Sequence, residues 1–463
     1  MGETYTDSDR RYLLIATCLA SIITPLMSTM MNLSLLSIGA DFDVGSHSQA
    51  YVNTMFLLGS VCCMVPAARY ASIHGMRRVF LLGLLTLIVS CILTFLSPNF
   101  QFLILMRFVI GFGSGMLMVT SIAMLTCVFP IANRGRIIGI NTTFVYLGLS
   151  VGPTIGGIIT DALGWRYIFI FILCLSILSF ILVSGFRKEV LIEPEAMMDW
   201  KGSVLWGMMI VVLMLGMVNI TTEWGPWCVI VGSALLVALW YYLRNSEQPA
   251  LNSRMFRNLL FTRSCVAAFM NYGASYCITF FLALYLQRIG QMSATEAGAL
   301  MLVQPLMQIL LTMKMGALSD RMTDKRILPA VGMALTGAGV AMYLFLDTNY
   351  SLPYVVVMMA IIGLGLGTFS APNNSLILSS VPPHFKGEAS GVLSVVRQTG
   401  MMISMSLAMS MISIIMGSTD NLTPENYGIF LDVIHYTFTV CLVMCAVGVI
   451  CSLIPIKGAQ DLN

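Results

Sequence analysis

The stretch Leu147-Gly-Leu-Ser-Val-Gly-Pro-Thr-Ile-Gly-Gly-Ile-Ile159 is rich in glycine and contains one proline. It lies in a run from 137 to 160 that carries no Asp, Glu, Lys or Arg. Small residues four apart let a neighbouring helix approach closely, and such residues here are Gly148, Gly152, Gly156 and Gly157. Pro153 removes one backbone hydrogen bond. The stretch predicts a bent membrane helix with a tightly packed glycine face; a general helix-packing face is the alternative.

Composition places the whole chain in the membrane. Hydrophobic residues make up 58% of the 463 residues, charged residues make up 10%, and the mean hydropathy is +0.88. A soluble domain of this length would need far more charge on its surface. Fourteen uncharged runs have at least 17 residues, about the length of a membrane span: 12–40, 44–68, 79–106, 108–133, 137–160, 167–186, 202–222, 224–243, 264–287, 297–313, 327–346, 348–385, 398–419 and 433–456.

The basic residues predict how these spans are oriented. If fourteen spans alternate in direction, 21 of the 24 Lys and Arg lie on the side that holds both termini. Arg166 and Arg288 lie on the other side, and Arg107 lies within a span. Basic loops stay in the cytoplasm, so we expect both termini there and the chain in the cytoplasmic membrane. The net charge of +3 then reflects topology and contact with membrane lipid, and it does not indicate nucleic-acid binding.

The second part of the chain repeats the first about 250 positions later, as in transporters built from duplicated halves. One recurring loop pattern is Ala68, Ser72, Arg77 and Arg78 with Gly316, Asp320, Lys325 and Arg326. Two further patterns are Gly111, Gly113 and Gly115 with Gly363, Gly365 and Gly367, and Pro130, Arg134, Gly135 and Gly139 with Pro382, Lys386, Gly387 and Gly391. We predict an all-α membrane protein with six-helix bundles at 10–188 and 254–457 and an inserted two-helix hairpin at 200–245.

This organisation resembles the fourteen-spanner drug:proton antiporter family of the major facilitator superfamily over essentially the whole chain. Leu147–Ile159 looks like the antiporter motif of that family, and Gly316-Ala-Leu-Ser-Asp320-Arg321 looks like its loop between the second and third helices of a half. Val381-Pro-Pro-His-Phe-Lys-Gly-Glu-Ala-Ser-Gly391, ahead of Arg397, is also similar to this family. The resemblance implies the major facilitator fold and a multidrug efflux transporter that works by alternating access.

Two charged loops are predicted to act as gates. In the second half, Asp320 can cap a helix N-terminus or pair with Arg321, beside Lys325 and Arg326, and this latch would break when the bundles rock. The first half has Ser72 at the corresponding position, ahead of Arg77 and Arg78, so its latch lacks the carboxylate and we expect a softer gate. A plain solvated turn is the alternative.

Proton coupling has no obvious carrier, because none of the carboxylates lies well inside a predicted span. A carrier has to be desolvated, titrate near neutral pH and be reachable from each side in turn. Three hypotheses stay open. Asp432 and His435, three apart on one helical face, form a titrating pair near the outer mouth. Asp161 or Glu223 takes the proton instead. In the third hypothesis, export is facilitated or is coupled through the charge of the substrate.

Arg107 and several uncharged side chains are the candidate substrate site. A charge held within the hydrocarbon is costly unless it is paired, so Arg107 is predicted to act in substrate binding or proton coupling. Its expected partners are backbone carbonyls, water or an anionic ligand group; a structural role near the fifth span is the alternative. The other predicted pocket residues are Met27, Asn32, Asn271, Tyr272, Tyr276, Gln304, Gln308 and Met401. Interhelical hydrogen bonding and core filling are their alternative roles.

We predict a monomeric secondary active exporter of hydrophobic or amphipathic compounds that works in exchange for protons. The alternatives are a facilitator, an exporter of lipophilic or anionic amphiphiles without proton coupling, and a non-transporting receptor or scaffold of the same fold. Lack of a deep carboxylate argues against dications as substrates. We expect no enzymatic activity, cofactor or metal site, because the four histidines are dispersed and the twelve cysteines lack ligand spacing.

Overall fold

A computed structural model describes residues 6–186, 188–190, 197–246, 253–322, 324–348, 351–382, 386–417 and 424–454. In this part of the chain all regular structure is helical, and fourteen helical spans are long and apolar enough to cross a membrane. The predicted all-helical membrane fold is therefore confirmed. Uncharged runs of this length form helices in a bilayer because only internal hydrogen bonds satisfy the backbone there.

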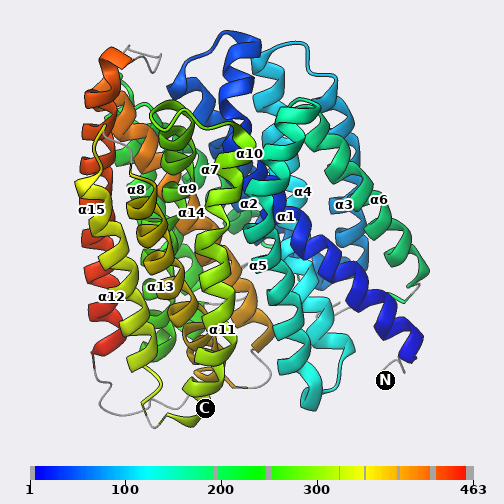
Figure 1. Cartoon of the computed structure of the whole chain (residues 1–463). Helices are drawn as coiled ribbons and strands as arrows, with labels where there is room; N and C mark the ends of the chain where they lie inside the picture. Colours follow the sequence, from blue (N-terminus) through cyan, green and yellow to red (C-terminus); the bar gives the residue numbers. More distant parts are fainter. Residues whose placement is uncertain are drawn as a thin grey trace.

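The first half consists of six long helices (Figure 1). They are α1 (Asp7–Phe42), α2 (Ser46–His74), α3 (Met76–Phe95), α4 (Phe100–Val128), α5 (Ile131–Ala162) and α6 (Tyr167–Gly185). The inserted hairpin follows as α7 (Trp200–Val218) and α8 (Gly225–Asn245), and a short 3-10 helix, η1 (Ser253–Arg257), precedes the second half.

In its described residues the second half also has six spans, one of which is broken. Its helices are α9 (Leu259–Arg288), α10 (Ala294–Met301), α11 (Val303–Arg321), α12 (Ile327–Met342), α13 (Leu352–Ser379), α14 (Lys386–Met416) and α15 (Tyr427–Leu453), with short 3-10 helices η2 (Tyr343–Phe345) and η4 (Pro424–Asn426). Helices α10 and α11 form one span that is interrupted at Leu302. Pro305 explains the break, because it has no N–H to donate to the carbonyl of Met301.

Helix packing repeats between the two halves. Helix α1 packs on α5 and α6, and α9 packs on α14 and α15 in the same way. Helix α4 packs on α2 and α3, and α13 packs on α11 and α12. Across the two halves, α5 contacts α10, and α14 contacts α2. The internal duplication that the sequence predicts is thus visible in the packing.

The two glycine triplets have equivalent positions in this packing. A Cβ on Gly111 would lie 2.0 Å from the carbonyl oxygen of Phe56 on α2. A Cβ on Gly113 would lie 2.9 Å from the carbonyl oxygen of Gly83 on α3. In the second half, a Cβ on Gly363 would lie 2.1 Å from the carbonyl oxygen of Gln304 on α11. The triplets therefore let α4 and α13 approach two neighbouring helices at once.

Helix α7 of the hairpin is hydrogen-bonded to both halves. The indole of Trp206 donates to the carbonyl of Val61 on α2 at 2.9 Å. Towards the other half, Thr221, just beyond α7, bonds Ser413 on α14 at 2.6 Å, and Ser410 donates to the carbonyl of Met217. Helix α8 packs mainly on α7 and is mostly exposed. We propose 10–188, 200–245 and 254–457 as the domain boundaries.

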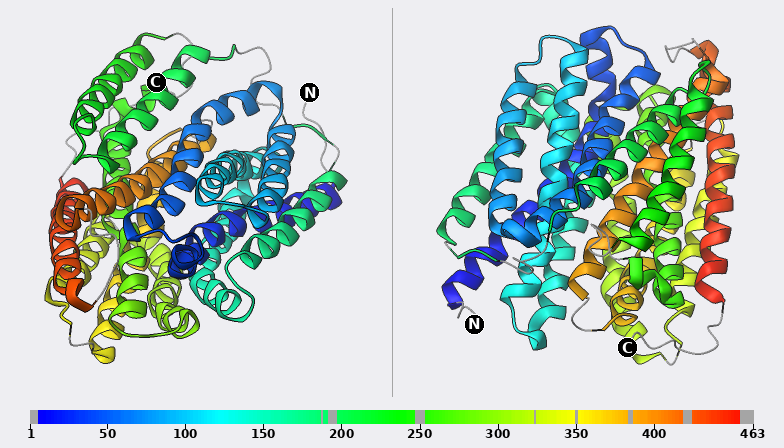
Figure 2. Two further views of the ribbon diagram at one scale, coloured as in Figure 1. Left: turned by 90° about the horizontal axis from the view of Figure 1, so that it is seen from above. Right: turned by 180° about the vertical axis from the view of Figure 1, so that it is seen from behind.

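Helix α1 begins and α15 ends at the same end of the molecule, the lower end in Figure 1. We call this the inner end, which the basic residues predict to be cytoplasmic, and we call the opposite end the outer end. Seen from above, the hairpin lies at the periphery, beside α2 and α14 (Figure 2).

Candidate functional site

Arg107 of α4 is fully buried between α1 and α2. Its Nε donates to the carbonyl of Val52 at 2.9 Å, and its Nη atoms lie 3.4 and 3.5 Å from the carbonyl of Met27. The guanidinium also lies over the ring of Phe56, 4.8 Å from the centroid, where the quadrupole of the ring attracts a cation. The partners are backbone carbonyls, as expected, but they belong to α1 and α2 and not to the region of the fifth span.

Polar side chains near Arg107 join the two halves. Asn32 of α1 donates to Thr279 of α9 at 3.1 Å, and it accepts from Asn53 of α2 at 2.6 Å. The hydroxyl of Tyr276 on α9 is hydrogen-bonded to Ser28 on α1. The structure thus brings the predicted residues Asn32 and Tyr276 to the same interface, next to Arg107.

A second polar cluster lies at the middle of α5, and the sequence analysis missed its main member. The hydroxyl of Tyr146 is buried without a hydrogen-bond partner of good geometry, and it lies near Tyr272, Ser370 and Arg397. These residues come from α9, α13 and α14. Only its place one residue before the antiporter-like stretch could have pointed to Tyr146. A buried polar group without a partner, between two halves, is suited to contact a ligand.

The other predicted pocket residues lie in the packing of the helices. Asn271 is buried and its amide donates to the sulfur of Met333 on α12, inside the second half. Gln304 and Gln308 pack their backbone against Gly363 and Gly367 of α13, and Met401 is buried on α14. Met27 contributes its carbonyl to Arg107, and its side chain is fully buried in the core.

The glycine face of α5 joins α1 and the second half. A Cβ on Gly148, Gly152 or Gly156 would lie 2.7, 1.9 or 2.6 Å from atoms of α1. On the other side, a Cβ on Gly157 would lie 2.4 Å from the carbonyl oxygen of Ala294, the first residue of α10. Pro153 packs against Gly298 of α10. The stretch is therefore a bifacial packing surface at the outer end of the interface.

Asp161 completes this contact. Its Oδ2 accepts from the backbone N–H of Thr295 at 2.7 Å and from the Thr295 hydroxyl at 2.6 Å. Because Thr295 lies in the first turn of α10, the carboxylate satisfies a free N–H and faces the positive end of the helix. Thr154 adds a hydrogen bond to the carbonyl of Gly298 at 2.9 Å.

The other candidates for proton coupling are Asp432, His435 and Glu223. In the described contacts, His435 is hydrogen-bonded to the carbonyl of Leu346 at 3.0 Å, and no ion pair links it to Asp432, which is exposed. Glu223 is exposed in the turn between α7 and α8.

The first-half loop has a carboxylate that the sequence analysis missed. Glu189, which follows α6, accepts from the backbone N–H of Arg77 at 2.8 Å and lies 3.6 Å from the guanidinium of Arg78. Ser72 donates to the carbonyl of Arg69 at 2.9 Å. The expectation that this loop lacks a carboxylate is corrected: the acidic group at the N-terminus of α3 comes from another part of the chain.

In the second-half loop, the side chain of Asp320 lies outside the described residues. Arg326 pairs with Asp324 through two bonds of 2.8 and 2.9 Å, and these bonds hold the pKa of Asp324 below its usual range. Arg321 is exposed, and Gly316 approaches Ala371 of α13. Lys325 lies beside this pair in the turn before α12.

Metal ligands are not gathered anywhere in the described part of the chain, where no group of three or more His, Cys, Asp or Glu could hold an ion. The arrangement of the described residues is instead two duplicated halves with polar clusters and a close helix contact between them. It is suited to bind a small molecule and to rearrange around it.

Comparison with known sequences gives one family. The sequence model of the Major Facilitator Superfamily matches residues 17–404 and 264–462. The riboflavin transporter RibZ of Clostridioides difficile is 31% identical over 397 residues, which cover 83% of this chain and 84% of the relative. Multidrug resistance protein 3 of Bacillus subtilis is 23% identical and covers 87% of this chain and 80% of its own length. Multidrug resistance protein Stp of Mycobacterium tuberculosis is 26% identical and covers 88% of this chain and 76% of its own length.

Solved structures show the same fold. A bacterial homologue of the human lysosomal transporter Spinster, inward-facing and unoccupied, matches with a TM-score of 0.70 and 16% identity over 97% of this chain and 98% of that chain. The human organic anion transporter MFSD10 matches with a TM-score of 0.64 and 16% identity over 96% of this chain and 99% of that chain.

Proposed function

This chain belongs to the major facilitator superfamily, and we propose that it exports hydrophobic or amphipathic small molecules by alternating access in exchange for protons. The family and its named relatives are transporters, so the chain is a transporter of the cell membrane and not an enzyme. The observation that carries the export proposal is the glycine face of α5, because it packs on α1 and α10 at once and resembles the antiporter motif.

The contacts between the halves support a state that is closed at the outer end. Among the described residues, the hydrogen bonds that cross between the halves run from the middle of the spans to the outer end, from Gln398–Ser60 and Ser28–Tyr276 to Asp161–Thr295. Helix α1 also leans away from the second half towards its inner end (Figure 1). Transport would break the outer contacts and form new ones at the inner end.

We place the substrate between the halves, at Tyr146, Tyr272, Tyr276 and Arg397. Tyrosines offer a flat apolar face and a hydroxyl, which suits an amphipathic ring system. In the described residues no Asp or Glu side chain is buried within a span, so two positive charges on a substrate would lose their hydration without compensation. The preferred substrate is therefore neutral, singly positive or anionic.

A second candidate function is facilitated transport of riboflavin without a proton carrier. It is favoured by the 31% identity to a riboflavin transporter and by the lack of a buried carboxylate among the described span residues. Riboflavin is a flat ring system with a polar chain, so Tyr146, Tyr272 and Tyr276 would bind it as well. The protein is proposed to act as a monomer in either case.

Proteoliposomes that contain the purified full chain test both functions. Uptake of a lipophilic dye and of riboflavin is measured with and without an imposed pH gradient, for the wild type, Tyr276→Phe and Asp41→Ala. Tyr276→Phe loses the bond to Ser28 in the proposed pocket, whereas Asp41 pairs with Arg166 on the surface of the first half.

Three results separate the possibilities. Uphill dye movement that follows the pH gradient and falls in Tyr276→Phe but not in Asp41→Ala supports proton-coupled export. Movement of riboflavin that only equilibrates, regardless of pH, supports the facilitator. No movement of either compound contradicts both candidates.

A further inference from the structure

A cavity lies at the inner end of the second half, where four helices meet. Its polar lining consists of Arg263, Ser264, Arg326, Asn373 and Ser452. These residues come from the start of α9, the turn before α12, and the inner ends of α13 and α15. We call it the inner cavity; it is separate from the cluster between the halves.

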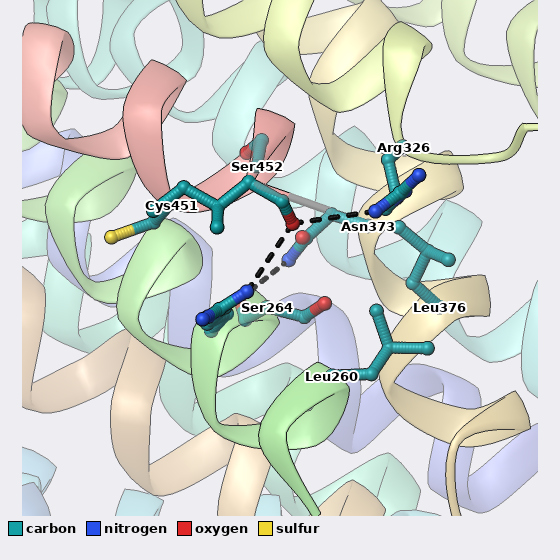
Figure 3. A pocket seen from close by; sticks show the side chains of 9 residues that line it. Leu260, Ser264, Arg326, Asn373, Leu376, Cys451 and Ser452 are labelled. Atoms are coloured by element: carbon teal, nitrogen blue, oxygen red, sulfur yellow. Dashed lines mark hydrogen bonds between the residues drawn. The ribbon is translucent and has the colours of Figure 1, made fainter. Parts of the chain in front are cut away.

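Two guanidinium groups converge in the inner cavity on a single neutral oxygen (Figure 3). Nη1 of Arg263 and Nη1 of Arg326 donate to the carbonyl of Ile454 at 3.2 and 3.3 Å. Hydrogen bonds from a guanidinium to an anionic oxygen are shorter, about 2.7–2.9 Å. A carbonyl at the end of α15 thus engages both groups only weakly.

The charge of the inner cavity is not balanced. Arg326 is paired with Asp324 through Nε and Nη2, which leaves its Nη1 facing the cavity. Among the described residues, no carboxylate forms an ion pair with Arg263. Two guanidinium groups and one carboxylate leave one net positive charge, which matches a single monoanionic group.

Exposed apolar side chains lie at the same end of the second half as the inner cavity. Ile327 and Val331 at the start of α12, and Ile450 and Leu453 at the end of α15, are exposed. We call these four exposed side chains, at the inner ends of two helices that pack on each other, the apolar strip. A ligand with a phosphate at one end and acyl chains at the other fits both parts.

We propose that the inner cavity binds the phosphate of an anionic lipid from the inner leaflet, held by Arg263 and Arg326. Anionic lipids concentrate on the cytoplasmic face of the membrane and attract basic residues there. A soluble phosphate compound has the same binding chemistry but no use for the apolar strip. Bound phosphate would replace the weak bonds to Ile454 with charge-assisted ones.

Native mass spectrometry of the purified full chain tests this proposal. Dioctanoyl phosphatidylglycerol is titrated against the wild type, Arg263→Gln and Arg257→Gln, with dioctanoyl phosphatidylcholine and inorganic phosphate as comparison ligands. Arg257 is exposed in η1 at the same end of the molecule, so Arg257→Gln removes the same charge outside the inner cavity. We expect the Kd for phosphatidylglycerol to rise at least tenfold in Arg263→Gln and less than twofold in Arg257→Gln.

The comparison ligands identify the source of the phosphate. Competition by millimolar inorganic phosphate would assign the inner cavity to a soluble phosphate compound, and its absence would assign it to the lipid. Equal losses in the two variants, or none in Arg263→Gln, would overturn the proposal in favour of a diffuse surface charge effect. If Arg263→Gln does not fold, Arg263→Lys is measured instead, because lysine keeps the charge and lacks the planar guanidinium. We expect the Kd for phosphatidylglycerol to rise at least threefold in Arg263→Lys. An unchanged Kd would again overturn the proposal.

Discussion

The contact between Asp161 and α10 can be weakened by one substitution, Asp161→Ala. It removes the acceptor of two hydrogen bonds, from the N–H and the hydroxyl of Thr295. Loss of a capping carboxylate at an exposed helix start costs about 0.5–2 kcal/mol, and the second bond places Asp161 in the upper part of this range. A loss of about 1–2 kcal/mol corresponds to a factor of about 5–30 in the equilibrium that opens this contact.

Hydrogen exchange of the purified chain measures this opening directly, because the Thr295 amide is itself a donor to Asp161. We expect exchange in the first turn of α10 to be about 5–30 times faster in Asp161→Ala. Asp41→Ala is the matched control: it also lies at the outer end, but its carboxylate bonds Trp165 and Arg166 within the first half. Unchanged exchange in Asp161→Ala, or an equal increase in the control, would refute this role of Asp161.

Three further predictions concern the close helix contact and the two loops. Gly156→Ala places a Cβ 2.6 Å from a backbone oxygen of α1 and should lower stability by about 1–3 kcal/mol in thermal unfolding, whereas Gly139→Ala, with open space around it, should not. Arg326 holds the pKa of Asp324 below its usual range. The contribution of Asp324 to stability is therefore present above its unfolded-state pKa and is lost as pH falls through its folded-state pKa. The stability difference between Asp324→Asn and wild type should be constant from pH 8 to about 5 and shrink below about pH 4. Glu189→Ala should cost about 1 kcal/mol and speed amide exchange at the start of α3; unchanged exchange would mean that this carboxylate does not hold the loop.

The spans and their duplication follow from the sequence because they depend on local patterns. Uncharged runs of sufficient length define the helices, and the spacing of Gly111, Gly113 and Gly115 predicts a close approach that the structure shows. The uncharged partners of Arg107 were predictable in the same way, since no carboxylate is available within the spans.

The partners of individual polar groups could not be predicted in this way. Asp161 meets Thr295, 134 positions away, and Glu189 meets Arg77, 112 positions away. Such pairs depend on how whole helices pack, and a single sequence holds no local pattern for them. Tyr146 was missed for the same reason, since its neighbours come from three helices of the other half.

The bonds of α7 to both halves have a mechanical consequence. Any movement that separates α2 from α14 at the outer end has to break the bonds of Trp206 and Thr221 or drag the hairpin sideways through the bilayer. Since α8 is apolar and mostly exposed, displacement of the hairpin would push aside the lipid around it. The thickness and stiffness of the surrounding bilayer would then affect the rate of each transport cycle. A chain without the hairpin would not meet this resistance.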